Sequence, residues 1–182
     1  MKYWKMNQGI TLLELILSIS IIGIIATFSV PNFNTMVNHS KVNSEAEQLF
    51  EFVRLAKTEA VKRNVSVELF YEIDSNNNHC IGMRKQGDSD SCELASSDYP
   101  RFIFDNSHHY NIKTVNAGGG VVNLSEGILV AFNPTTGKST NSRRVLVNST
   151  SDPNFVSGVR ITDVGFIFPC SSLTHGGKSL CV

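Results

Sequence analysis

The segment Gly9-Ile10-Thr11-Leu12-Leu13-Glu14-Leu15 decides how this 182-residue chain is organised. It follows a short leader that contains Lys2 and Lys5. It also begins an apolar stretch of 21 residues, Ile10 to Val30, in which Glu14 is the one ionisable side chain. As a helix this stretch would be about 30 Å long, which matches the hydrocarbon core of a bilayer. We therefore expect one membrane-spanning helix with the basic leader in the cytoplasm.

Two other interpretations of the apolar stretch fit the residues less well. A buried core helix would be apolar on all sides within a domain too small to surround it. A secretory signal peptide has an apolar run of about 7–15 residues that ends at a small-residue cleavage site. This run is longer, and the sequence Pro31-Asn32-Phe33 that follows it is not such a site.

Glu14 is the unexpected residue of the stretch. A carboxylate inside an apolar helix costs a few kcal/mol on membrane-insertion scales, so it marks a candidate functional site. The alternative is an acid in the first helical turn, where the helix dipole favours negative charge. That alternative requires the helix to begin near Ile10.

The glycine, the acid five residues later, the basic leader and the apolar run together resemble the type III signal of type IV pilins and type II secretion pseudopilins. The resemblance implies that a prepilin peptidase cuts between Gly9 and Ile10 and N-methylates Ile10. Glu14 would then be the fifth residue of the mature chain, where it pairs with the terminal amine of a neighbouring subunit during assembly. Pro31 falls where many such pilins carry a helix-bending proline.

Beyond Pro31 the pattern predicts a second helical segment and then a β-rich domain. Apolar residues recur at steps of four and three, which indicates a helix that faces a core and stops near Asn64. They are Val42, Ala46, Leu49, Val53, Ala56 and Ala60. Short alternating segments separated by turn residues then predict strands. We expect these at 65–73, 80–85, 101–104, 112–115, 127–132, 143–148 and 158–168.

The predicted fold class is therefore α+β, with one long helix packed on a small antiparallel sheet. We divide the chain into a leader at 1–9, an apolar helix at 10–30, a periplasmic helical half at 31–64 and a β-rich domain at 65–182. The run from Leu55 to Asn64, and a later strand that ends in Ala131-Phe132-Asn133-Pro134, are similar to the FimT/GspH subgroup of minor pilins and pseudopilins.

The four cysteines all follow the apolar stretch, on the side expected to be the oxidising periplasm. Four cysteines allow three connectivities, and proximity in sequence favours Cys80–Cys92 and Cys170–Cys181. A zinc site built from His79, Cys80, Cys92 and His175 is the alternative, although it lacks any paired C-x₂-C spacing. We expect no metal, no cofactor and no catalytic residue, because no serine, histidine and acid form a nucleophilic motif.

The resemblance implies a non-enzymatic subunit of the inner membrane whose carboxyl-terminal domain is periplasmic and which enters a pilus or pseudopilus. Its partners would be the prepilin peptidase, other pilins and membrane lipid. The main hypothesis is a minor pilin that initiates or caps a type IV pilus, and the alternative in the same architecture is a type II secretion pseudopilin.

A second hypothesis from a different class is DNA binding for DNA uptake. Some FimT-like proteins use a Gly-Arg-x-Arg stretch near the carboxyl terminus, but phenylalanines stand at the matching place, Gly165-Phe166-Ile167-Phe168. The remaining candidate for DNA binding is a small basic surface. Its members would be Arg143, Arg144, Arg160 and Lys178. Sixteen Lys and Arg against sixteen Asp and Glu give zero net charge, which argues against binding by bulk charge.

Overall fold

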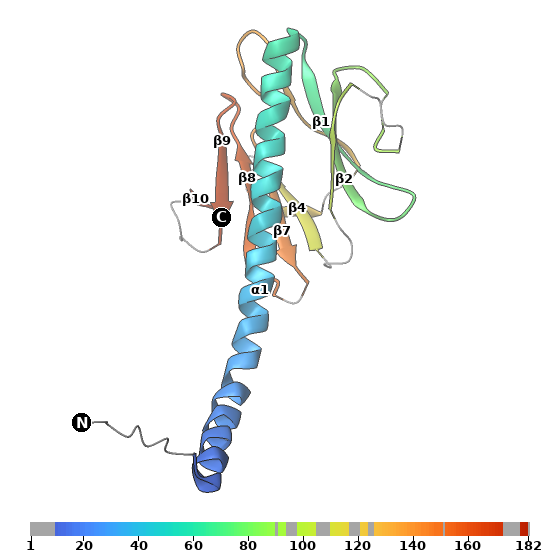
Figure 1. The fold of residues 1–182 in the computed structure, drawn as a ribbon. Helices are drawn as coiled ribbons and strands as arrows, with labels where there is room; N and C mark the ends of the chain where they lie inside the picture. Colours follow the sequence, from blue (N-terminus) through green and yellow to red (C-terminus); the bar gives the residue numbers. More distant parts are fainter. Residues whose placement is uncertain are drawn as a thin grey trace, which may run out of the picture. The chain divides into compact units, whose positions relative to one another are not determined.

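The protein consists of one long helix followed by two β-sheets, an α+β architecture (Figure 1). The computed structural model describes residues 10–89, 91–93, 98–104, 110–116, 121–123, 126–150, 152–172 and 179–181. Contacts divide the chain into a unit that ends at Val37 and a second unit that begins at Asn38. The second unit contains both sheets and the half of the helix that packs on them.

Helix α1 runs from Leu12 to Arg63 and continues through Pro31. It ends where the sequence predicts, because Asn64 adopts a left-handed backbone with φ of 53°. The amide of Val65 bonds the Ala60 carbonyl at 3.2 Å and that of Asn64 bonds the Val61 carbonyl at 3.3 Å. This pair of bonds is a Schellman motif, which satisfies the last carbonyls of the helix.

The predicted apolar stripe of α1 is confirmed as the centre of the core. All six of its residues, from Val42 to Ala60, are 2% exposed or less. All of them except Ala46 share one cluster with side chains from both sheets, including Tyr71 and Val147. Burying such side chains contributes roughly 25 cal/mol per Å² of apolar surface. The helix thus holds the two sheets in one domain.

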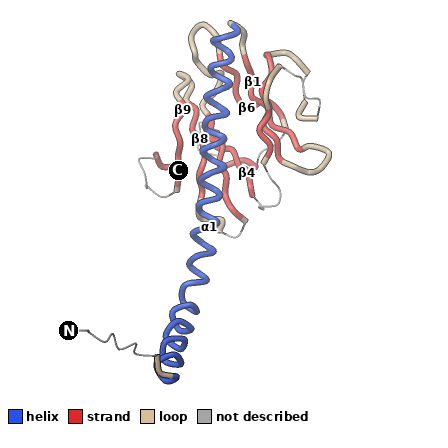
Figure 2. The backbone as a smooth tube through the Cα atoms, in the orientation of Figure 1, coloured by secondary structure: helices blue, strands red, loops and turns tan. Residues whose placement is uncertain are grey.

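The first sheet has four strands in the order β3-β2-β1-β6, all antiparallel (Figure 2). Its strands are β1 (Val67–Ile73), β2 (His79–Lys85), β3 (Arg101–Ile103) and β6 (Gly127–Phe132). Strands β1 and β2 form a hairpin around Asp74, whose carboxylate accepts bonds from the amides of Asn76 and Asn78. This Asx-type turn explains why the polar run 74–78 separates the two strands.

The second sheet has six strands in the order β10-β9-β8-β7-β4-β5. Its strands are β4 (Tyr110–Asn116), β5 (Val121–Asn123), β7 (Arg143–Ser149), β8 (Val156–Ile161), β9 (Ile167–Ser171) and β10 (Ser179–Leu180). All pairs are antiparallel except β9 and β10, which run parallel. The sequence analysis expected one sheet, and it predicted neither β5 nor β10.

The predicted single strand at 158–168 is wrong. The chain instead turns between β8 and β9, where the Gly165 amide bonds the Thr162 carbonyl at 2.8 Å. Gly165 has a φ of +83°, a conformation that glycine adopts without strain. Its carbonyl accepts a bond from Lys57 Nζ at 2.8 Å, so this turn is tied to helix α1.

The membrane-span prediction receives no support from the helix geometry. Within the part of the chain that the structure describes, no helix combines the length and apolar character that crossing a membrane requires. The span therefore stays a prediction.

Gly165→Ala should destabilise the domain by about 3 kcal/mol, because strain and a clash act together. A Cβ at Gly165 would lie 1.9 Å from the Gly137 carbonyl oxygen. Gly87→Ala is the matched control: Gly87 also has a positive φ, +92°, but has open space around a Cβ. It should cost about 1 kcal/mol, the strain alone. Urea unfolding of both variants measures the difference, and equal costs would contradict the clash.

Candidate functional site

The amino-terminal end of α1 places Glu14 in its first turn. The Glu14 amide bonds Thr11 Oγ1 at 3.2 Å, so Thr11 is the N-cap of the helix. Thr-x-x-Glu at 11–14 is also the spacing of a capping box, a signal that the sequence analysis did not use. Glu14 therefore lies where the helix dipole favours a carboxylate. An isolated chain accommodates this acid without a partner subunit.

The helix that follows Glu14 is covered with exposed apolar side chains on all of its faces. Ten large residues between Leu12 and Ile25 are 50% to 76% exposed. They are Leu12, Leu13, Leu15, Ile16, Leu17, Ile19, Ile21, Ile22, Ile24 and Ile25. An apolar surface that continues around a whole helix needs lipid or protein to cover it. The exposed apolar surface makes this segment a candidate interaction element.

The basic residues proposed for DNA binding do not form one surface. Arg144 and Arg160 lie directly opposite each other on β7 and β8, whereas Arg143 precedes Arg144 and faces the other side of the sheet. Arg144 donates to the Cys181 carbonyl at 3.1 Å, and Arg143 approaches the Ile128 carbonyl at 3.5 Å. Lys178 lies outside the described residues. The structure thus brings two of the four together and separates a third.

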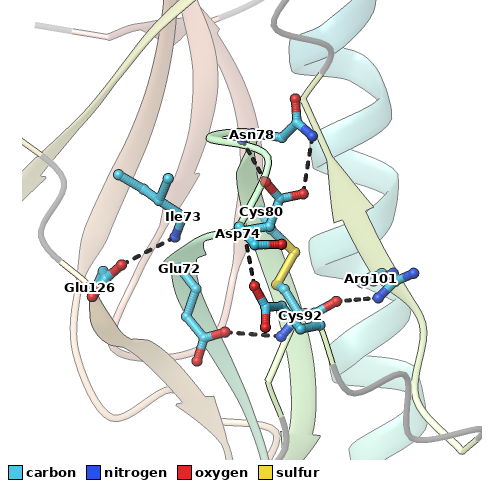
Figure 3. Close-up of a disulfide and its surroundings, with 10 residues drawn as sticks. Glu72, Ile73, Asp74, Asn78, Cys80, Cys92, Arg101 and Glu126 are labelled. Atoms are coloured by element: carbon cyan, nitrogen blue, oxygen red, sulfur yellow. Dashed lines mark hydrogen bonds between the residues drawn. A yellow bond between two sulfur atoms is a disulfide. The ribbon is translucent and has the colours of Figure 1, made fainter.

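Both disulfides join the cysteine pairs expected from proximity, Cys80–Cys92 and Cys170–Cys181. Figure 3 shows that the loop carrying Cys92 is also held by hydrogen bonds. The Cys92 amide bonds Glu72 Oε2 at 2.9 Å, and the Cys92 carbonyl accepts a bond from Arg101. The bonded sulfurs leave no thiolate for the zinc alternative. Among the described residues no group of three or more His, Cys, Asp or Glu side chains could hold a metal ion.

A close contact between two titratable side chains of neighbouring strands is neutral. Tyr71 Oη lies 2.5 Å from His79 Nδ1, across the β1–β2 hairpin. Burial raises the pKa of Tyr71 to about 12 and lowers the pKa of His79 below its usual 6.5. Tyrosine therefore keeps its proton and donates it to a neutral imidazole. This pair fastens one strand to the next.

A comparison with protein families identifies the amino-terminal segment. Residues 4–30 match the model of the prokaryotic N-terminal methylation motif. Neither the search of curated proteins nor the search of solved structures found a match.

The methylation motif covers the leader residues from Trp4, the capped helix start and the exposed apolar helix. Gly9 and the bond to Ile10, where we expect cleavage, lie within it. Gly9 is outside the described residues, and Ile10 is exposed immediately before the Thr11 cap. Proteins with this type IV prepilin-like motif are processed by a prepilin peptidase, and their roles are structural rather than catalytic.

A second feature that the sequence analysis missed is a contact that fastens α1 to the β-rich domain. His39 Nε2 lies 2.7 Å from Asp152 Oδ2, in the loop after β7, and the His39 ring stacks on Phe155 with 3.8 Å between centroids. The hydrogen bond from His39 holds the pKa of Asp152 below its usual 3.8. The two partners are 113 residues apart in sequence, so no local pattern could have indicated their contact.

The stabilising contribution of Asp152 should be lost in acid, so the domain should be less stable at low pH. Its lowered pKa contributes stability above about pH 4, and this contribution is lost as pH falls through the folded pKa. Asp152→Asn should therefore lower the urea midpoint at pH 6, with a smaller effect at pH 3. Asp88→Asn, at an exposed position, is the surface control. An effect of Asp152→Asn that is equal at both pH values would contradict a stabilising role for the Asp152 carboxylate.

Proposed function

We propose that this protein is a minor pilin, a structural subunit that is processed by prepilin peptidase and helps to initiate or cap a type IV pilus. The observation that carries the proposal is the methylation motif at residues 4–30. In the proposed pathway the leader at 1–9 stays in the cytoplasm and the apolar helix resides in the inner membrane. The domain that follows is periplasmic, which agrees with its two disulfides.

Filament assembly explains the exposed apolar helix in physical terms. Stacked subunits cover each other's apolar side chains when the helix leaves the lipid. Glu14 would then be enclosed, and the methylated amine of Ile10 from a neighbouring subunit would be its counter-ion. Such an enclosed pair sets the register between subunits more reliably than it adds stability. The small domain is displayed on the outside of the filament.

A type II secretion pseudopilin would use the same motif, helix and processing. The methylation motif does not discriminate between the two machines, because both employ it. Purification does: a minor pilin copurifies with sheared surface pili, whereas a pseudopilin remains with the envelope fraction. We favour the pilus subunit because the disulfide Cys170–Cys181 fastens the carboxyl-terminal tail of a domain that would be displayed outside the cell.

Cleavage should occur between Gly9 and Ile10. Mass spectrometry of the mature protein should find Ile10 at the amino terminus with one added methyl group. Gly9→Leu should retain Met1 and the leader, because the peptidase then meets a bulky residue at the cut. A mature chain that begins elsewhere in the wild type would contradict the proposed processing.

Glu14→Ala should be cleaved and methylated normally but should enter filaments at least about tenfold less efficiently, because register is lost. The amount of subunit in sheared filaments, relative to the amount in membranes, measures this. Glu14→Asp keeps the charge and should retain part of the incorporation. If Glu14→Ala enters filaments as well as wild type, Glu14 serves as a first-turn acid and not in assembly.

A further inference from the structure

We propose that a groove between helix α1 and strand β3 is the docking site for the basic end of α1 from a second copy of this chain. The proposal rests on the proposed function, because it describes how two subunits would contact each other in the filament. The groove has a volume of about 500 Å³. Its lining residues are Ser44, Glu47, Gln48, Glu51, Phe52, Leu55 and Phe102.

The floor of the groove is apolar and preformed. Phe52 from α1 and Phe102 from β3 face each other with ring centroids 5.9 Å apart, and Phe102 packs edge-on against Phe104 at 4.7 Å. Leu55 extends the apolar surface along the helix and is 40% exposed.

The rim of the groove is acidic, and neither helix end explains the acids. Glu47 and Glu51 lie more than ten residues from both Leu12 and Arg63, whereas the helix dipole acts within the first and last turns. Glu47 has an interaction within the chain, and Glu51 contacts Arg54 at 3.1 Å, with a side chain that stays 64% exposed. An exposed pair of this kind stabilises a helix by a few tenths of a kcal/mol. The rim therefore favours a cationic partner and disfavours an anionic lipid or nucleic acid.

The last turns of α1 present the complementary surface. Val61 is 55% exposed although it is apolar. Lys62 Nζ lies 3.6 Å from Glu59 Oε1, but the Lys62 side chain stays 71% exposed. Lys62 follows Leu55 by seven residues and Glu51 by eleven, so it continues the helix face that lines the groove. One face of α1 thus carries acids on an apolar floor at one end, and a lysine beside an exposed valine at the other.

The acidic groove of one copy can contact the basic end of α1 from a second copy when one helix is displaced along the other. Lys62 lies about 16 Å from Glu51 and about 22 Å from Glu47 along the axis, which sets the displacement. The groove and the basic end are different patches, so their contact is heterologous. A heterologous contact that does not close into a ring generates an open helical filament. In a filament the same contact can therefore join two neighbouring copies of this chain without closing on itself.

Site-directed cross-linking tests the contact in the full-length chain. Two differently tagged copies are co-expressed in pilus-assembling cells, one with Glu47→Cys and the other with Lys62→Cys, and are then oxidised mildly. We expect a disulfide-linked dimer that carries both tags. The matched control replaces Glu47→Cys by Asp88→Cys, an exposed acid outside the groove, and should give at least about tenfold less dimer. Peptide mapping verifies that the two native disulfides are intact.

A charge exchange provides an independent second measurement. The double variant Glu47→Lys/Glu51→Lys should reduce incorporation into filaments about tenfold, because it places lysines opposite Lys62. Adding Lys62→Glu to the same chain should restore incorporation, since every contact then has opposite charges again. A merely structural role of the two acids would not be rescued by a change eleven or more residues away.

Three outcomes would overturn the proposal. They are a cross-link no stronger than that of the Asp88 control, a cross-link to a different subunit, and a charge exchange without rescue. Leader removal and filament incorporation are read from the same samples. If these are normal while the cross-link is absent, the docking groove is wrong and the proposed function stands. If the leader is retained, the proposed function fails as well.

Discussion

Burial of one narrow face of helix α1 is the constraint on which the β-rich domain depends. The face combines three alanines, Ala46, Ala56 and Ala60, with the larger residues Val42, Leu49 and Val53, and all six are 2% exposed or less. Small side chains allow the strands to approach the helix closely, and the larger ones fill the space between the two sheets. Each sheet buries one face against the same helix. Loss of this stripe would separate the sheets as well as expose the helix.

This arrangement leaves the opposite face of the helix to other tasks. The core contacts occupy one side of the segment from Val42 to Ala60, so charged residues on the other side are selected by solvent and by partners. The amino-terminal part from Leu12 has no such division, because apolar residues surround it completely. Helix α1 thus has two kinds of environment along its length. The folded domain supplies the environment of the segment from Val42 to Ala60 alone.

Much of the fold could be predicted because its signals are local. The helical stripe, the stop at Asn64 and most strands follow from periodicity and turn residues within a few positions. The failures involve long-range or very short elements. Strands β5 and β10 have three and two residues, too few for a pattern. The turn between β8 and β9 depends on a left-handed Gly165 and on Lys57, which is 108 residues away.

The residues of the candidate site also divide into those that a local sequence signal indicates and those that only the fold brings together. A linear motif identifies Gly9, Ile10 and Glu14, whereas the contact between His39 and Asp152 exists through folding alone. The grouping of Arg143 with Arg144 was avoidable, because adjacent residues of a strand point to opposite faces. Sequence adjacency is evidence for a shared surface in a turn and evidence against it in a strand.

The position of Glu14 shows how one residue can satisfy the single chain and the filament in turn. As the third residue of a capped helix, it is stabilised by the dipole and by water before assembly. In the proposed filament, enclosure by neighbouring subunits would remove the water, so the carboxylate would then need a cation to replace it. Cleavage after Gly9 would create a terminal amine four residues before Glu14 in every copy. The proposed processing would therefore supply the counter-ion before assembly encloses the acid.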